Sequence, residues 1–208
     1  MLKEMSCVPI RQLLRNKAIT SSNETKSKES SLALRAQKKI LGKLANRGVI
    51  KHFVNDTSLR LFDGLFIILK DYYNEKDASK TIKNMLKIAI KLGVMVRENQ
   101  LNPEQLRYLS DFQKKLESLT LTIMSFAKVD YSYDRNFLTS QLDSTKAKLD
   151  TLVGSTLSDK SKRRVSQIFG HISDSRLLDE MFIKKGAYHE NFMCLIDDLE
   201  KLVDGDEL

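Results

Sequence analysis

One stretch of this chain decides its fold class: residues 102–126 read NPEQLRYLSDFQKKLESLTLTIMSF. Its large apolar residues recur at steps of three and four, at Leu106, Leu109, Phe112, Leu116, Leu119, Ile123 and Phe126. Positions three and four apart lie on one side of an α-helix, so this spacing predicts a helix with one buried face. Asn102, Pro103 and Glu104 supply a cap, a first-turn proline and an acid, which together favour a helix start.

The same period recurs along most of the 208 residues. Apolar stripes and capping residues, among them Asp56, Asp77 and Asp134, predict further helices over about residues 31–46, 56–73, 77–97, 134–153, 158–169 and 188–203. We find no strand-like alternation, and only two prolines and eight glycines interrupt the chain. We therefore predict an all-α fold, a single domain of about six substantial antiparallel helices over residues 30–208. Residues 1–29 are polar, which predicts a flexible basic N-terminal arm.

Charge is unevenly distributed along the chain. The formal net charge is +8, but residues 197–208 hold six acids and one base, so this segment carries −5 and the remainder +13. Such polarity indicates an anionic partner, which could be a membrane, a phosphorylated ligand or a nucleic acid. We find no DNA- or RNA-binding motif and no aromatic residues between the cations, so we expect no nucleic-acid partner.

The segment from Ser30 to Asn55 contains six Lys or Arg residues and no acid. On a helical period these cations cover one half of a helix and apolar residues cover the other half; the cations are Arg35, Lys38, Lys39, Lys43, Arg47 and Lys51. A basic amphipathic helix suits a membrane surface or an acidic partner. The alternative is that the cations form only a solvated face.

A second segment, Thr81–Arg97, is apolar around almost its whole circumference. A narrow row of lysines interrupts this surface, at Lys80, Lys83, Lys87 and Lys91. A helix that is apolar on nearly all sides is usually a core helix. With a lysine edge, it could instead line the site of an apolar ligand that has a charged end.

The sequence gives little support for an enzyme. His52, His171 and His189 show no metal-ligand spacing with cysteine or acid, and there is no nucleophile elbow or Gly-rich phosphate loop. We interpret Asp130 as a linker residue and His171 as the maker of a structural hydrogen bond. We therefore expect no catalytic residues, no metal and no cofactor.

The chain carries two cysteines, one near each end, which favours a reducing compartment. No run approaches the length of a spanning helix, and charged residues interrupt any signal-peptide core at the N-terminus. These features predict a cytoplasmic protein.

Five stretches, taken in order, resemble the tumour-necrosis-factor-alpha-induced protein 8 family, often called the TIPE family. They are LRAQKKILGK at residues 34–43, DTS at 56–58, IKNMLKIAIK at 82–91, SFAKVDYSYDR at 125–135 and HISD at 171–174. The resemblance covers roughly residues 30–205 and leaves residues 1–29 outside it.

The resemblance implies a single all-α domain whose helices surround an elongated hydrophobic lipid-binding cavity. Members of this family are described as binding and transferring phosphoinositides, with acyl tails in the cavity and cations at the mouth of the cavity. They act in apoptosis, immune signalling and directed migration, at the inner face of the plasma membrane and with signalling proteins of cell-death or small-GTPase pathways. Carried onto this chain, the mouth cations are Lys38, Lys39, Lys43, Arg47 and Arg97.

The chain departs from the family pattern at three positions. Gln113 stands where a cation is often found, Val96 stands where a histidine often precedes the arginine, and Gly170 replaces an acid. These departures concern the preference for a headgroup more than the cavity.

Large apolar residues occur on more than one face of the second and third predicted helices, which favours a cavity over a solid core. We predict that it is lined by Phe62, Phe66, Ile90, Val94, Phe112, Leu116, Leu138 and Leu142. The preferred function is therefore a non-enzymatic phosphoinositide-binding and transfer protein. The alternative is a helical adaptor that regulates cell death through protein contacts only and carries no lipid.

Overall fold

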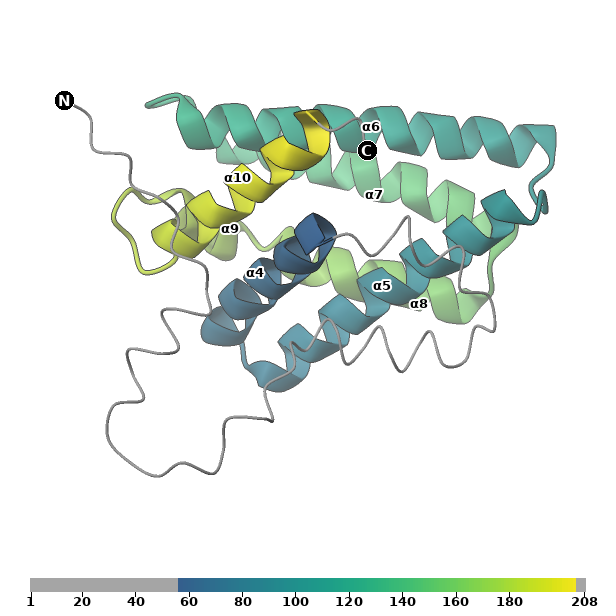
Figure 1. The fold of residues 1–208 in the computed structure, drawn as a ribbon, viewed down its shortest axis with the longest axis horizontal. Coiled ribbons are helices and arrows are strands. Elements are labelled where there is room, and N and C mark those ends of the chain that lie inside the picture. The colour runs from purple at the N-terminus through teal and green to yellow at the C-terminus, as the bar shows by residue number, and fades with distance from the viewer. Residues whose placement is uncertain (1–55, 205–208) are drawn as a thin grey trace. The chain divides into compact units, whose positions relative to one another are not determined.

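The structure, a computed structural model, describes residues 56–204, which all belong to one compact unit of the chain. This part contains seven helices and no strand: α4 (Asp56–Tyr72), α5 (Glu75–Arg97), α6 (Pro103–Lys128), α7 (Arg135–Thr156), α8 (Asp159–Ile172), α9 (Ser175–Phe182) and α10 (His189–Asp204) (Figure 1). The all-α prediction is confirmed. The predicted arm and the helix expected over residues 31–46 lie outside the described residues.

Helix α6 begins as its sequence predicts. Asn102 Oδ1 accepts a hydrogen bond from the Gln105 backbone N–H at 2.9 Å, and Gln105 Oε1 accepts one from the Asn102 backbone N–H at 3.0 Å. This reciprocal capping box satisfies two backbone donors that the first turn leaves unpaired. Asp134 caps α7 as predicted, since its Oδ1 accepts from the Phe137 backbone N–H at 3.0 Å.

The cap predicted for α5 is wrong. The helix begins at Glu75, and the cap is Asn74, whose Oδ1 accepts from the Asp77 backbone N–H at 3.0 Å. Asp77 lies in the first turn instead, where its Oδ2 accepts from Asn74 Nδ2 at 2.8 Å. Either residue type can cap a helix. An acid is also favourable in the first turn, because its negative charge lies near the positive end of the helix dipole.

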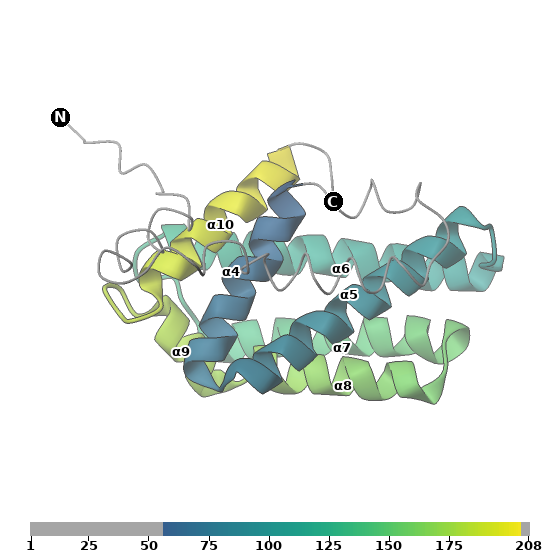
Figure 2. The ribbon, with the colours of Figure 1, turned by 60° about the horizontal axis from the view of Figure 1, so that its bottom comes forward.

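The helices pack mainly with their neighbours in the chain, and α10 returns to α4. In Figure 1, α6 and α7 run side by side, and α10 crosses close to α4. Figure 2 shows α7 beside α8, with α5 crossing them. Helix α5 packs chiefly against α4 and α8 rather than against α6, which follows it in the chain.

Within residues 60–204, most of the buried apolar side chains form two clusters. The α4–α10 cluster comprises Ile68, Leu69, Ala78, Ile82, Leu86, Leu177, Met181, Phe192 and Ile196. The α7–α8 cluster comprises Ile88, Leu92, Leu119, Leu138, Leu142, Leu149, Leu152, Val153, Val165, Ile168, Phe169 and Leu178. Met85, Ile123 and Phe182 are partly buried and pack against both clusters. Burial of these side chains supplies the main stabilisation of the bundle.

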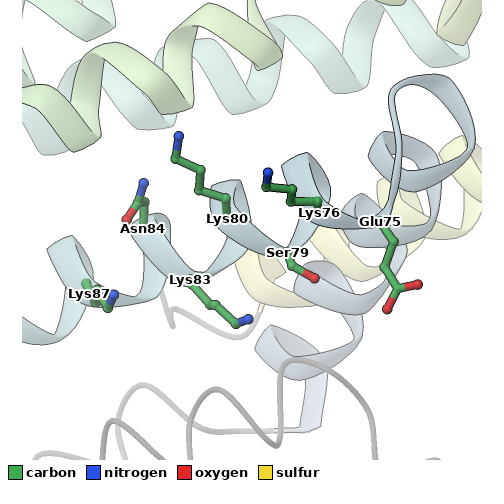
Figure 3. A pocket seen from close by; sticks show the side chains of 7 residues that line it. All are labelled: Glu75, Lys76, Ser79, Lys80, Lys83, Asn84 and Lys87. Atoms are coloured by element: carbon green, nitrogen blue, oxygen red, sulfur yellow. The ribbon is translucent and has the colours of Figure 1, made fainter.

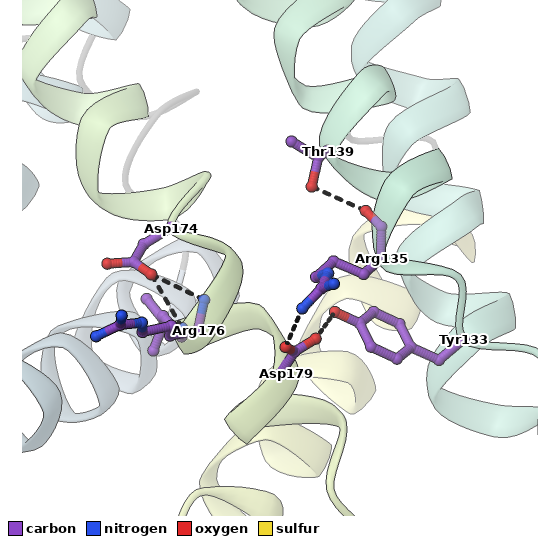
Figure 4. Close-up of polar contacts among 7 residues, drawn as sticks. Tyr133, Arg135, Thr139, Asp174, Arg176 and Asp179 are labelled. Carbon is purple, nitrogen blue, oxygen red and sulfur yellow. Dashed lines mark hydrogen bonds and ion pairs between the residues drawn. The ribbon is translucent and has the colours of Figure 1, made fainter.

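Helix α9 was not expected from the sequence, because its eight residues offer too few turns for a clear period. Contacts from elsewhere hold it in place (Figure 4). Tyr133 donates a hydrogen bond from its hydroxyl to Asp179 at 2.9 Å, and Arg135 pairs with the same carboxylate at 2.8 Å. The Tyr133 ring also stacks on Phe182, with centroids 4.3 Å apart. Tyr133 and Arg135 belong to the 125–135 stretch that resembles the family, and here they position α9.

Asp174 caps α9 and links it to Tyr73, the residue that follows α4. Its Oδ1 accepts from the backbone N–H groups of Arg176 at 2.9 Å and Leu177 at 3.3 Å, and its Oδ2 accepts from the Tyr73 hydroxyl at 2.8 Å. Burial alone would raise the pKa of Asp174, but the hydrogen bonds from Tyr73 and from the two backbone groups outweigh it, so the pKa lies below its usual value.

We expect Asp174→Ala to lower the free energy of unfolding by about 1–2 kcal/mol at pH 7. A carboxyl with a lowered folded-state pKa stabilises the protein above its unfolded pKa of about 3.9, and this contribution is lost as the pH falls through the lower folded-state value. In urea denaturation, the difference in the free energy of unfolding between the wild type and the variant should therefore decrease on acidification to below pH 3. Asp143→Ala, at an exposed acid of α7, is the matched control. An equal difference in the free energy of unfolding at neutral and at acid pH would contradict a role for the charge of the Asp174 carboxylate.

Candidate functional site

An open groove of about 600 Å³ lies along the first half of α5. Seven residues of this helix line it: Glu75, Lys76, Ser79, Lys80, Lys83, Asn84 and Lys87 (Figure 3). Lys80, Lys83 and Lys87 belong to the lysine row that the sequence singles out. In Figure 3, Lys76 and Lys80 project from one side of the helix and Lys83 from the opposite side, so cations flank the groove.

The groove is predominantly cationic, since its lining holds four lysines and one acid, Glu75. From Ala78 to Arg97 the helix carries five Lys or Arg residues and no acid. Lys76, Lys80 and Lys83 are exposed, and no carboxylate of residues 60–204 forms an ion pair with any of the three. Ordinary protein surfaces intersperse charges of both signs, so a cationic groove of this kind attracts anions.

Polar side chains on the flank of α5 that faces α8 fix the two helices together. Thr81 Oγ1 lies 2.6 Å from His171 Nδ1, and Asn84 Nδ2 donates to Gln167 Oε1 at 2.9 Å. Gln167 Nε2 donates in turn to Thr81 Oγ1 at 2.9 Å. The prediction that His171 makes a structural hydrogen bond is confirmed. Since buried polar groups need such partners, these bonds explain why polar residues interrupt the apolar surface of α5.

Of the five predicted headgroup-binding residues, the structure describes Arg97 alone. Arg97 is the last residue of α5 and is exposed. With a rise of about 1.5 Å per residue, it lies roughly 15 Å along the helix from Lys87, beyond the groove. The other four, Lys38, Lys39, Lys43 and Arg47, lie outside the described residues, so their grouping with Arg97 stays a prediction.

The eight residues predicted to line a cavity fall into two groups. Phe62, Phe66, Val94, Phe112 and Leu116 are half-buried. Ile90 is 5% exposed, Leu142 4% and Leu138 0%. The half-buried group has surface that a ligand could contact, whereas Ile90, Leu138 and Leu142 expose little or none. None of the eight lines the α5 groove, and the cavity itself stays a prediction.

A second open groove, of about 590 Å³, lies where α6 and the start of α7 adjoin. Its lining mixes exposed apolar side chains, Leu121 at 55% and Phe137 at 48%, with polar residues. The lining residues are Lys114, Glu117, Ser118, Leu121, Thr122, Ser125, Phe126 and Phe137. The sequence did not single out this surface, because Leu121 lies off the apolar stripe of its helix.

Sequence reasoning also missed part of the α5 groove. Lys76 lies one turn before Lys80 and could have been found by extending the lysine row backwards. Asn84 could not have been found in this way, since its hydrogen bond to Gln167 depends on the packing of α8 against α5. Within residues 56–204, no three His, Cys, Asp or Glu side chains could hold a metal ion together. No helix in this part is both long and apolar enough to cross a membrane.

The fold and the groove define an all-α helical-bundle protein with a cationic surface site. A family model described as "Tumor necrosis factor alpha-induced protein 8-like" matches residues 27–206. The chain therefore belongs to the tumour necrosis factor alpha-induced protein 8 family, as the resemblance of its motifs predicted.

Curated relatives agree with this assignment over most of their length. The chain is 37% identical over 175 residues to tumor necrosis factor alpha-induced protein 8 of Gallus gallus, covering 84% of this chain and 93% of the relative. It is 35% identical over 179 residues to the Homo sapiens protein of the same name, covering 86% and 90%. Its identity to the Xenopus laevis tumor necrosis factor alpha-induced protein 8-like protein 3 is 35% over 175 residues, covering 84% and 87%.

Proposed function

We propose that this protein is a non-enzymatic phosphoinositide-binding and transfer protein that acts at the cytoplasmic face of the plasma membrane. In this role it regulates apoptosis, immune signalling and phosphoinositide-dependent migration. The observation that carries the proposal is the groove on α5, whose lining holds four lysines and one acid, Glu75, on a helix whose apolar residues are packed in the core. The relatives are named for induction by tumour necrosis factor alpha, which supports the link to cell-death signalling.

Two physical terms favour an anionic lipid as the ligand. Each buried methylene of an acyl chain contributes about 0.8 kcal/mol, so a long chain contributes on the order of 10 kcal/mol before the costs of binding. Each cation close to an anionic membrane surface adds about 1 kcal/mol. The exposed Lys76, Lys80 and Lys83 of the groove would together supply about 3 kcal/mol of this attraction.

The proposal assigns separate parts of the ligand to separate side chains. The acyl chains would contact the half-buried apolar residues of α4, α5 and α6, which are Phe62, Phe66, Val94, Phe112 and Leu116. The phosphorylated headgroup would meet the cations that the family resemblance places at the mouth, Lys38, Lys39, Lys43, Arg47 and Arg97. The α5 groove would hold the protein on the anionic membrane during loading.

A second candidate function is an adaptor that binds signalling proteins and carries no lipid. The observation that favours it is the groove over α6 and α7, where Leu121 and Phe137 expose about half of their surface. Exposed apolar side chains in a polar rim are typical of protein-binding surfaces.

Native mass spectrometry of the purified full-length protein separates the two functions. If the protein carries lipid, we expect a population whose mass exceeds the chain mass by one phospholipid, and a larger such population after incubation with phosphoinositide vesicles. Phosphatidylcholine vesicles are the control for non-specific uptake. A spectrum with the unliganded mass alone, before and after incubation, would favour the adaptor.

A further inference from the structure

The first two turns of α8 carry more positive charge than is usual at the start of a helix. They contain Lys160, Lys162, Arg163 and Arg164, against one acid, Asp159. Acids are favoured at this end because the helix dipole is positive there, so cations at the same end raise the local potential further. Unpaired backbone N–H groups at a helix start also favour a bound anion.

Asp159 does not neutralise the side of α8 that faces α5. Its carboxylate pairs with Lys162 at 3.3 Å. The Lys162 side chain lies over α7, where its Cε is 3.5 Å from the place that a Cβ on Gly154 would occupy. Lys160 and Arg164 are four residues apart and therefore share another face of α8. No carboxylate of residues 60–204 forms an ion pair with either of them.

A third cation reaches this face from α5. Lys91 Nζ donates a hydrogen bond to Ser161 Oγ at 3.3 Å, and Ser161 is fully buried between the helices. Burial lowers the pKa of Lys91, and the nearby charges of Arg164 and Lys160 lower it further. Lys160 and Arg164 lie on the same stripe of α8 as Gln167, which accepts a hydrogen bond from Asn84 of α5. Because the bonds Asn84–Gln167 and Lys91–Ser161 run in opposite directions along the two helices, this stripe lies beside Lys91. Three cations from two packed helices are thus close together, and their mutual repulsion favours an anion between them.

We propose that the seam between α5 and the first turns of α8 binds a phosphate monoester through Lys91, Lys160 and Arg164. A doubly charged phosphate group suits three converging cations, and a guanidinium can hold two of its oxygens at once. The two segments contain no aromatic residue on which a nucleic-acid base could stack, between Thr81 and Arg97 or between Asp159 and Gln167. This site is separate from the α5 groove and from the predicted cavity mouth, and it does not depend on lipid cargo.

The phosphate can belong to a soluble inositol phosphate or to a lipid headgroup, and the test separates these sources. Binding of inositol trisphosphate to the full-length protein is measured by isothermal titration calorimetry. We expect the Lys160→Gln/Arg164→Gln variant to bind roughly tenfold to a hundredfold more weakly than the wild type, because it loses two charge-assisted contacts. Lys128→Gln/Lys184→Gln removes the same charge from paired lysines at the end of α6 and after α9, and this variant should bind within about twofold of the wild type.

A parallel arm uses vesicles with a phosphatidylinositol phosphate or with phosphatidylserine at equal surface charge. Loss of soluble binding together with unchanged vesicle binding assigns the site to soluble inositol phosphates. Loss of both assigns it to the phosphorylated headgroup as well. Circular dichroism and thermal melting control for folding. If Arg164→Gln prevents folding, Lys160→Glu can replace it, because Lys160 is exposed and its replacement should leave the fold intact. Equal weakening by the two double variants, or no weakening by either, would overturn the proposal.

Discussion

Replacement of Lys38, Lys39, Lys43 and Arg47 with glutamine is expected to weaken binding to anionic vesicles by about 4 kcal/mol at low salt, roughly a thousandfold. The reason is that each cation near an anionic bilayer contributes about 1 kcal/mol, and the four residues share the polar half of one predicted helix. Glutamine is a good helix former, so we expect folding to be preserved. Co-sedimentation with vesicles, across salt and lipid composition and with circular dichroism as a folding check, measures the effect.

A control of equal charge is available elsewhere in the chain. Lys146, Lys148, Lys162 and Lys184 each pair with an aspartate, so their replacement by glutamine removes four charges that are already partly neutralised. Surface pairs of this kind contribute little, and this variant should retain most of the vesicle binding. Arg97→Gln should instead change the preference among phosphoinositides more than bulk attachment. If the variant with Lys38, Lys39, Lys43 and Arg47 replaced folds and still binds phosphoinositide vesicles at full strength, these cations are only a solvated face and the adaptor function gains support.

Phe192→Ala is expected to lower the free energy of unfolding by about 3–5 kcal/mol, a large share of the 5–15 kcal/mol typical of a domain. Phe192 is 2% exposed and lies in the α4–α10 cluster beside residues of α4, α5 and α9. Its ring also meets Phe182 edge to face, with centroids 4.7 Å apart. Truncation removes these contacts and leaves a cavity that helices from distant parts of the sequence cannot close completely.

Urea denaturation followed by circular dichroism measures this loss. Phe137→Ala is the matched control, because Phe137 is 48% exposed and its ring contacts Phe126 at a centroid distance of 6.1 Å. We expect the control to lose about 1 kcal/mol. Similar losses for the two variants would mean that Phe192 does not occupy the core position described here.

Local signals predicted most of the fold. The period of α6 and its capping box are properties of neighbouring residues, and both are present in the structure. Helix α9 was missed because its stability comes from Asp174, Tyr133 and Arg135, which connect it to other elements. The wrong cap for α5 shows a different limit, since Asn74 and Asp77 both fit a helix start and only the backbone geometry separates them.

The candidate site was predictable only where one helix builds it. The lysine row of α5 follows from its spacing in the sequence, and the groove contains three of its four members. The seam with α8 was not predicted, because Lys91 meets Lys160 and Arg164 through packing between distant segments. A surplus of apolar residues also has two explanations, a solid core or a lipid-lined cavity, and the sequence pattern is the same for both.

The most direct measurement of the central claim is phosphoinositide transfer between vesicles. Donor vesicles carry a fluorescent phosphatidylinositol bisphosphate with a quencher, and acceptor vesicles carry neither. We expect the full-length protein, present in amounts far below the labelled lipid, to increase fluorescence at a rate proportional to its concentration. Labelled phosphatidylcholine should be transferred much more slowly. An unchanged transfer rate for the phosphoinositide, with folded protein that binds the same vesicles, would contradict the account.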